Sequence, residues 1–401
     1  MIDLAGGAST QSRARRPLPA GAVSAVTIET FGARETVDFR MADGTTQSKT
    51  LLSWVIGQSG CLWGGGPLPD IIEKERGWAK DFLSGAYGHQ AEHDLAAALS
   101  PIYEPLLGGD LSVRFFQNAG DACSAAARVA RAHTKRQTIA SYGYHGAHLD
   151  YAHEPKNVGV PDFISFTHKR FEWGDVFRIK ELALTVAAIV VEVPPVDDDN
   201  AREFLSEIRA ACDWCGAVMV LDDTVLGFRL ALGGSCEYYG VRPDIVILGK
   251  AMSATGCVSA VLGKRGMVGR LATDVFYSTT FGGAPGPCAI AAATANWLRE
   301  HKVEAYGYSS LMLGMSEYRV GHLRHIGKAL KDGLNSLGYT VIGQPERSVA
   351  IFDSEDERRA WCSRMIEQGI IVDRPFFPTL AHTMDDVTKT LEAAKFIKDS
   401  L

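Results

Sequence analysis

The sequence predicts an α/β fold, with a large domain around a mostly parallel sheet covered by helices on both faces, and a smaller α+β domain built from the two chain ends. Two observations favour this fold. Short apolar stretches alternate with helical patterns through the middle of the chain, which is typical of βαβ units. After about residue 308 the pattern changes to helix, strand, strand, helix and helix, which indicates local α+β connections.

A chain of 401 residues is long enough for two such domains, each with its own core. We expect residues 1–60 to form an N-terminal arm and part of the small domain, and residues 61–307 to form the large domain. Residues 308–401 then complete the small domain.

The elements are expected in the following order. Alternating residues around Ala42-Asp43-Gly44 indicate a hairpin within 26–54, and an aromatic, Gly-rich loop precedes a helix at 69–80. Further helices are expected at 91–106, 119–134, 201–215, 287–301, 319–337, 355–368 and 384–399. Further strands are expected at 113–118, 138–140, 187–192, 218–222, 339–343 and 348–352, with another that ends at Lys250. The three aspartates at 197–199 are interpreted as a solvated approach to the helix at 201.

Composition excludes several classes of partner. The formal charge of −6 provides no basic field for nucleic acid or an anionic membrane, so a small metabolite is the expected partner. No apolar run approaches the ~20 residues of a membrane helix. The first residues lack an apolar core after a basic start, so we expect no secretory signal.

The eight cysteines are interpreted as reduced thiols of a cytoplasmic protein, because they are scattered and mostly lie in apolar surroundings. Cys212-Asp-Trp-Cys215 has the spacing of a zinc or redox site, but no second pair of metal ligands follows it. The sequence therefore predicts no metal site.

Two charged residues each follow a short buried strand. Asp222 ends VMVLD and Lys250 ends PDIVILGK. Ligands gather outside the carboxyl ends of strands in open α/β sheets, so both residues would face one crevice. Such a pair suits pyridoxal phosphate, because a lysine amine forms a Schiff base with its aldehyde and a carboxylate keeps its ring nitrogen protonated. The alternative is a solvated strand end and a turn or helix cap.

A phosphate site is expected at the segment Asn118-Ala119-Gly120-Asp121. A strand, a small-residue turn and a helix N-terminus together present backbone N–H groups and the positive end of a helix dipole. The alternative is an ordinary capped helix start, and we expect the Asp121 carboxylate itself to cap the helix.

The segments LDDTVLGFR and PDIVILGKAMSATGCVSAVLGKR resemble the DEVxTGFR and PDxxxxGKAxxxGxPxxAxxG signatures of class III pyridoxal-phosphate aminotransferases, in particular the glutamate-1-semialdehyde aminomutase-like branch. The resemblance extends over nearly the whole chain and is densest in 113–148 and 218–290. It implies the fold type I of aspartate aminotransferase and the cofactor pyridoxal 5'-phosphate.

The resemblance also implies cofactor contacts. FFQNAGDA is similar to the phosphate-cup segment of the family, and YHG places Tyr144 against the pyridine ring with His145 in a supporting position. Thr224 stands where the family has a Val under the ring, which makes that face more polar. STTFGG resembles the TFGGNP segment that reaches the neighbouring subunit's cofactor, so Thr280 implies a homodimer with shared active sites. The expected cofactor-binding residues are Ala119, Gly120, Asp121, Tyr144, Asp222, Thr224, Lys250 and Thr280.

Three residues are candidate substrate contacts by the same resemblance. GGASTQSR is similar to the GGxxxxxR segment that enters the active site, which points to Arg13. Trp54 would line the substrate mouth, and Arg374 stands where the aminomutases carry a Glu. The alternatives are a disordered basic tail, hydrophobic packing between domains and an exposed arginine before a proline turn.

The sequence therefore predicts an aminotransferase in which Lys250 and Asp222 are catalytic and act on a small amino donor and a carbonyl acceptor. One alternative is an intramolecular aminomutase, a racemase or another pyridoxal isomerase, which the N-terminal arm supports and Arg374 weakens. Another is a non-catalytic binding protein on the same fold, because fold does not guarantee activity. Retention of both Lys250 and Asp222 counts against that last interpretation.

Overall fold

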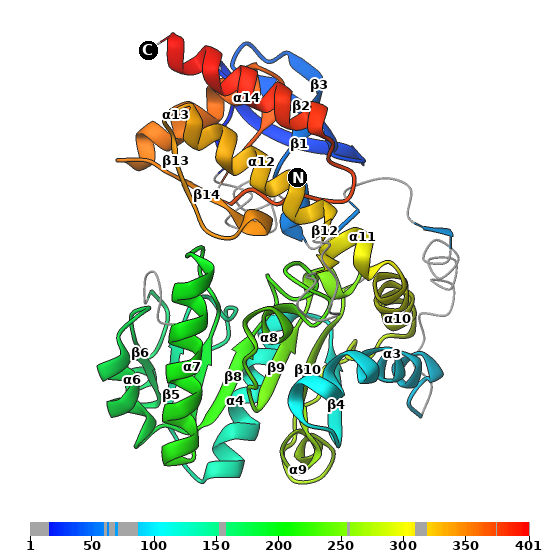
Figure 1. Cartoon of the computed structure of the whole chain (residues 1–401), viewed down its shortest axis with the longest axis vertical. Helices are drawn as coiled ribbons and strands as arrows, with labels where there is room; N and C mark the ends of the chain where they lie inside the picture. Colours follow the sequence, from blue (N-terminus) through cyan, green and yellow to red (C-terminus); the bar gives the residue numbers. More distant parts are fainter. Residues whose placement is uncertain are drawn as a thin grey trace. The chain divides into compact units, whose positions relative to one another are not determined.

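The computed structural model describes residues 16–59, 62–63, 69–70, 87–151, 158–254, 257–308, 319–373 and 375–400 (Figure 1). The chain divides into two compact units, which we call the terminal unit (residues 1–67 and 307–401) and the central unit (residues 68–306). Each is described by itself below.

The described part of the central unit contains a seven-stranded sheet in the order β4-β10-β9-β8-β7-β5-β6. Strands β9, β8, β7, β5 and β6 are mutually parallel, whereas β10 is antiparallel to both of its neighbours. This agrees with the predicted mostly parallel sheet. The strands are β4 (Leu111–Phe116), β5 (Ile139–Tyr142), β6 (His168–Arg170), β7 (Ala188–Val191), β8 (Val218–Asp222), β9 (Ile245–Leu248) and β10 (Ser259–Lys264).

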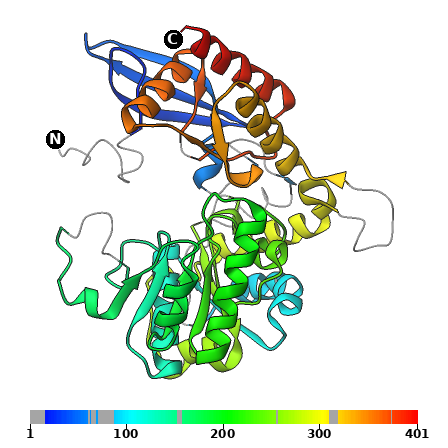
Figure 2. The same cartoon turned by 60° about the vertical axis from the view of Figure 1, so that its left-hand side comes forward.

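Helices cover this sheet on both faces. Val218, Val220 and Ile247 belong to one core cluster with the alanines of α4 and with residues of α9. Helix α7 packs against β7 and β8 on the other face of the sheet (Figures 1 and 2). The helices are α3 (Gln90–Leu107), α4 (Ala119–Thr134), α5 (Ile164–Thr167), α6 (Val176–Ala183), α7 (Asp198–Cys215), α8 (Gly234–Tyr239), α9 (Arg265–Val268), α10 (Pro285–Glu300) and α11 (Lys302–Tyr306). The short 3-10 turns are η4 (Lys250–Met252) and η5 (Gly269–Ala272).

The central strands are apolar along their length because both faces are covered. Every residue of β7, β8 and β9 is buried. Such strands carry no alternating pattern, and polar groups are found only where they end. Asp222 is therefore the last residue of β8.

The terminal unit joins the two ends of the chain in one sheet. Its described strands have the order β1-β2-β3-β15, and β15 is parallel to β3 with Ile370 opposite Leu52. The strands are β1 (Ala22–Phe31), β2 (Arg34–Met41), β3 (Thr46–Ser53) and β15 (Ile370–Ile371), with the pairs β11 (Gly307–Tyr308) and β12 (Arg319–Val320), and β13 (Thr340–Ile342) and β14 (Val349–Ile351). The helical elements are α12 (His322–Ser336), α13 (Glu355–Glu367), α14 (Met384–Asp399), η2 (Ile56–Ser59) and η7 (Pro345–Arg347).

The hairpin expected around Ala42-Asp43-Gly44 is confirmed as β2 and β3. Asp43 Oδ1 accepts hydrogen bonds from the amide of Thr45 at 2.9 Å and from its hydroxyl at 2.6 Å. Gly44 has a φ of +86°, a left-handed conformation that glycine adopts without steric cost. Turn chemistry thus sets the register of the two strands.

The interpretation of the aspartates before α7 is corrected. This helix begins at Asp198, three residues before the expected start, because Asp197 is its N-cap and accepts a hydrogen bond from the amide of Asn200 at 2.9 Å. Asp198 and Asp199 lie in the first turn, where negative charge interacts favourably with the helix dipole. The acidic run is therefore part of the helix. The helix expected at 69–80 lies largely outside the described residues.

Within the described ranges, none of the helices has the length and apolar character needed to cross a membrane.

A glycine in α12 provides a test of packing in the terminal unit. A Cβ on Gly327 would lie 2.0 Å from the Pro345 carbonyl oxygen, which is backbone and cannot move aside. We therefore expect Gly327→Ala to destabilise the protein by about 1–3 kcal/mol, although Ala normally favours a helix. Thermal unfolding measures this, with Gly266→Ala as the control, since a Cβ there meets nothing within 4 Å. Equal melting temperatures for both variants would contradict this packing.

Candidate active site

Asp222 and Lys250 lie at the carboxyl ends of neighbouring parallel strands. Asp222 pairs with Ile247 across β8 and β9, and Lys250 follows β9 directly after Gly249. Lys250 has a φ of +42°, in the left-handed region that costs a non-glycine residue free energy. Such a conformation is retained where the surrounding structure requires it, and these positions cluster at functional sites.

Asp222 is 4% exposed, and donors surround its carboxylate. Its Oδ1 accepts from the Thr224 hydroxyl at 2.6 Å and the Thr224 amide at 3.2 Å. Its Oδ2 lies 2.7 Å from His145 Nδ1 and accepts from Cys123 Sγ at 3.4 Å. Burial by itself raises the pKa of Asp222, but the hydrogen bond and charge of His145 and the bonds from Thr224 together hold that pKa below its ordinary value. The carboxylate is therefore ionised at neutral pH.

His145 is a donor at both ring nitrogens. Its Nε2 lies 3.0 Å from the Tyr142 carbonyl oxygen, which can only accept, so Nε2 carries a hydrogen. Its Nδ1 faces the ionised carboxylate of Asp222 and carries the second hydrogen. The ring is thus a cation paired with Asp222. The sequence suggested a supporting position for His145. The structure places His145 in direct contact with the Asp222 carboxylate.

The segment before α4 caps the helix through a different residue from the one expected. Asn118 is the N-cap, and its Oδ1 accepts from the Asp121 amide at 3.0 Å. The Asp121 carboxylate instead accepts from Asn118 Nδ2 at 2.7 Å and lies 3.1 Å from His148 Nε2. The expectation that the Asp121 carboxylate caps the helix is wrong. The Asp121 amide is already bonded to Asn118. The first two amides of the helix, those of Ala119 and Gly120, are therefore better donors for a phosphate.

Glycines bring three parts of the site together. A Cβ on Gly146, whose φ is +93°, would lie 2.7 Å from Gly120 Cα, so this loop rests directly on the start of α4. A Cβ on Gly249 would lie 3.3 Å from Thr224 Cγ2 and 3.6 Å from Ala119 Cβ. The residue before Lys250 thus adjoins both the α4 segment and the loop after Asp222.

Tyr144, which directly precedes His145, has an exposed ring. The Tyr144 side chain is 73% exposed, whereas the neighbouring His145 is buried. The Tyr144 amide donates to Glu192 Oε2 at 3.2 Å, and a Cβ on Gly143 would lie 2.6 Å from Glu192 Cβ. The backbone is therefore fixed while the ring remains available for stacking on a planar group.

Thr280 is exposed in the segment between β10 and α10. Phe276 and Phe281, in the same segment, are 83% and 60% exposed. A Cβ on Gly282 would lie 3.1 Å from the Phe115 carbonyl oxygen, so the segment packs against the end of β4. Large apolar side chains exposed together are typical of an interaction surface.

The three candidate substrate residues have different outcomes. Arg13 and Arg374 lie outside the described residues. Trp54 is fully buried in the terminal unit, where its indole donates to Thr390 Oγ1 at 2.8 Å and stacks on His382 with ring centroids 4.1 Å apart. These contacts explain Trp54 as a packing residue of the terminal unit, and a substrate contact is not needed to explain its position.

Cys123 and His148 were not anticipated from the sequence. Cys123 lies one turn along α4 and its thiol contacts Asp222, which is 99 positions away in sequence, so no local pattern marks it. Cys123, His145 and Asp222 have ligand atoms within 4.8 Å of one another, a set of types that could hold a metal ion. Burial raises the pKa of Cys123 well above its ordinary value, so it stays a thiol that donates to Asp222. Hydrogen bonds from Cys123 and His145 to Asp222 therefore account for this cluster without a metal ion.

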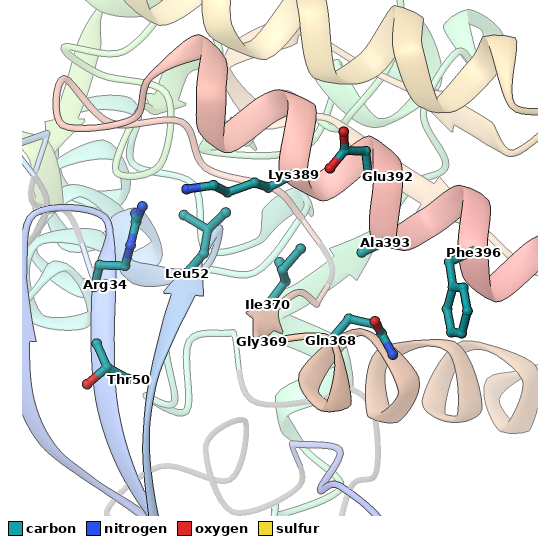
Figure 3. Close-up of a pocket in the computed structure, with 10 residues that line it drawn as sticks. All are labelled: Arg34, Thr50, Leu52, Gln368, Gly369, Ile370, Lys389, Glu392, Ala393 and Phe396. Carbon is teal, nitrogen blue, oxygen red and sulfur yellow. The ribbon is translucent and has the colours of Figure 1, made fainter.

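A separate cavity of about 490 Å³ lies in the terminal unit (Figure 3). Arg34 and Lys389 end at one side of it and Phe396 lies at the other. Arg34 is already paired with Asp386 at 2.6 Å. None of the residues that the sequence singled out lines this cavity.

Comparison with known proteins identifies the family. The model of the family described as aminotransferase class-III matches residues 169–374, which is just over half of the chain. The chain belongs to the class-III aminotransferases. The family and the fold predicted from the motifs are confirmed, and so is the cofactor, pyridoxal 5'-phosphate. The protein is accordingly an enzyme of amino-group transfer or of the related aminomutase type.

Curated relatives and solved structures agree with this assignment. Glutamate-1-semialdehyde 2,1-aminomutase of Ignicoccus hospitalis is 31% identical over 87% of this chain and 88% of that protein. The enzyme of the same name from Desulforamulus reducens is 28% identical over 83% and 84%. An ω-transaminase from Sphaerobacter thermophilus has a TM-score of 0.76 at 20% identity, covering 98% of this chain and 94% of that one. A glutamate-1-semialdehyde aminomutase from Pseudomonas aeruginosa PAO1 has a TM-score of 0.77 at 15% identity, covering 99% and 91%.

The residues of this class-III aminotransferase fit its cofactor. Gly120, Gly146 and Gly249 leave a cradle that side chains would fill. The start of α4 suits a phosphate, and the ionised Asp222 suits a protonated ring nitrogen. The cofactor aldehyde requires an amine for a Schiff base, and Lys250 carries one directly after Gly249 at the end of β9.

Asp223 provides a pH-dependent test, because burial raises its pKa to about 7, partly offset by hydrogen bonds from Ser235 at 2.6 and 2.9 Å. The folded state thus binds a proton more tightly than the unfolded state, so this carboxyl makes stability fall as pH rises from about 4 to about 7. Asn resembles the protonated side chain in shape and donors. We expect Asp223→Asn to flatten the decrease in melting temperature over that range, and a parallel curve for variant and wild type would contradict the assignment.

Proposed function

We propose that this class-III aminotransferase moves an amino group between a small amino donor and a carbonyl acceptor, with Lys250 as the residue that bonds the cofactor and carries the proton. The observation that carries the proposal is the placement of Lys250 and the ionised Asp222 at the ends of adjacent strands. When bound, pyridoxal phosphate supplies an electron-withdrawing ring that stabilises negative charge at the substrate α-carbon.

Asp222 would hold the ring nitrogen protonated, since its carboxylate is anionic and buried. The His145 cation behind it keeps the carboxylate from taking up a proton of its own. The amides of Ala119 and Gly120 would bind the phosphate at the start of α4, and the exposed Tyr144 ring would cover one face of the pyridine. Lys250 Nζ would move a proton at the substrate α-carbon.

We further propose a homodimer in which Thr280 reaches the phosphate of the partner's cofactor. The exposed Phe276 and Phe281 beside Thr280 support an interface at this segment.

A cytoplasmic location is proposed as well. Seven described cysteines are free thiols, which fits a reducing compartment.

An intramolecular aminomutase is the second candidate. The names of the curated relatives favour it. Arg374, where the aminomutases carry a Glu, favours transfer between separate molecules, because an arginine removes a negative partner for a substrate ammonium. Arg13 and Arg374 are proposed as contacts for a substrate carboxylate.

Replacement of the lysine tests the central assignment. Lys250→Ala is expected to abolish turnover and the imine-linked absorbance of the purified protein, because the imine forms on the amine that this substitution removes. Lys264→Ala, at the exposed end of β10, is the matched control and should retain both. If Lys250→Ala retained either property, Lys250 would not be the cofactor lysine.

Single-turnover spectra distinguish amino transfer between two molecules from an intramolecular aminomutase reaction. We expect an amino donor alone to convert the bound cofactor to its aminated form and a carbonyl acceptor to restore it. A panel of donors then identifies the substrate class. Interconversion of a diamino or amino-carbonyl compound without any acceptor would establish the aminomutase instead, and no spectral change with any amine would overturn both.

A further inference from the structure

The Asp222 carboxylate is already surrounded by four donors. A carboxylate has about four lone-pair positions, two on each oxygen. His145 and Cys123 occupy Oδ2, and the hydroxyl and amide of Thr224 occupy Oδ1. A protonated ring nitrogen is a fifth donor. One of the four must therefore give up its position when the cofactor binds.

The donors differ in their freedom to move. The ring of His145 is held at its far side by the Tyr142 carbonyl, and the Thr224 amide belongs to the backbone. Cys123 Sγ lies on the oxygen that His145 also contacts, so His145 remains on Oδ2 whether or not the thiol moves. The side-chain donor to Oδ1 is the Thr224 hydroxyl, which moves by rotation about single bonds, although its 2.6 Å bond is the shortest of the four.

The Thr224 side chain also lies close to other residues of the site. Its Cγ2 is 3.3 Å from the position of a Cβ on Gly249, the residue before Lys250, and the same position is 3.6 Å from Ala119. The Thr224 side chain, which contacts Oδ1, thus lies beside the residue before Lys250 and close to the start of α4. His145 and Cys123 bond the other oxygen.

We propose that the Thr224 hydroxyl is a placeholder for the cofactor: it occupies the lone pair of Asp222 Oδ1 that the protonated ring nitrogen takes on binding. The hydroxyl stabilises the cofactor-free chain, because it satisfies a buried charge. It also lowers cofactor affinity, because its bond must break first. Thr224 is thus a positioning residue that sets how readily the enzyme gives up its cofactor, and this inference rests on the proposed contact between Asp222 and the ring.

The test compares Thr224→Val with Thr224→Ser in the full-length chain. Valine keeps the shape of the side chain without its donor, and serine keeps the donor. We expect the cofactor-free Thr224→Val protein to melt at a lower temperature than wild type and to bind pyridoxal 5'-phosphate about tenfold more tightly in absorbance titrations, a gain of about 1.4 kcal/mol. Thr224→Ser should match wild type in both measurements. A purely structural role would weaken stability and binding together.

A cofactor analogue with carbon in place of the ring nitrogen gives the decisive control. The analogue has no donor for Asp222, so the advantage of Thr224→Val over wild type should disappear. Thr224→Ala replaces Thr224→Val if the valine variant does not fold.

Unchanged or weaker binding of pyridoxal phosphate by the donor-free variant would overturn the placeholder. An equal advantage with the analogue would overturn it as well. Wild-type protein that binds no pyridoxal phosphate would instead overturn the proposed function.

Discussion

The structure depends on keeping one buried carboxylate ionised. Isolated charges are costly to bury and are retained only when they are paired and hydrogen-bonded. Asp222 meets this requirement through a cation, His145, on one oxygen and through Thr224 on the other. Each of these donors comes from a different turn of the chain around the carboxyl ends of the strands. The need to satisfy Asp222 therefore fixes how the loops after β5 and β8 and the first turns of α4 pack.

The adjacent carboxyl shows what happens without a cation. Asp223 follows Asp222 in sequence, but its donors are the neutral hydroxyl and amide of Ser235. Burial consequently raises the pKa of Asp223 to about 7, while the pKa of Asp222 is held below its ordinary value. Two neighbouring carboxyls thus differ in how tightly they bind a proton because of their partners, which is how a protein assigns different tasks to identical groups.

Glycines allow close packing at the site because they have no side chain. Gly146 lies backbone to backbone against Gly120, and Gly249 lies beside the side chains of Thr224 and Ala119. Solved structures share this fold at low sequence identity, such as 20% for the ω-transaminase from Sphaerobacter thermophilus. The motifs could be recognised because backbone requirements of this kind restrict residue types at a few positions, even where most other positions differ.

The sequence by itself determined the α/β architecture, the family, the cofactor and the placement of Asp222 and Lys250 at strand ends, because these follow from local periodicity and short motifs. It did not determine the partners of Asp222. His145 and Cys123 are 77 and 99 positions away from it, and no local pattern encodes such distances. The helix cap at Asn118 and the two-residue strand β15 were decided in the same way by tertiary packing. Contacts between distant segments depend on how the layers pack, and only the folded chain specifies that.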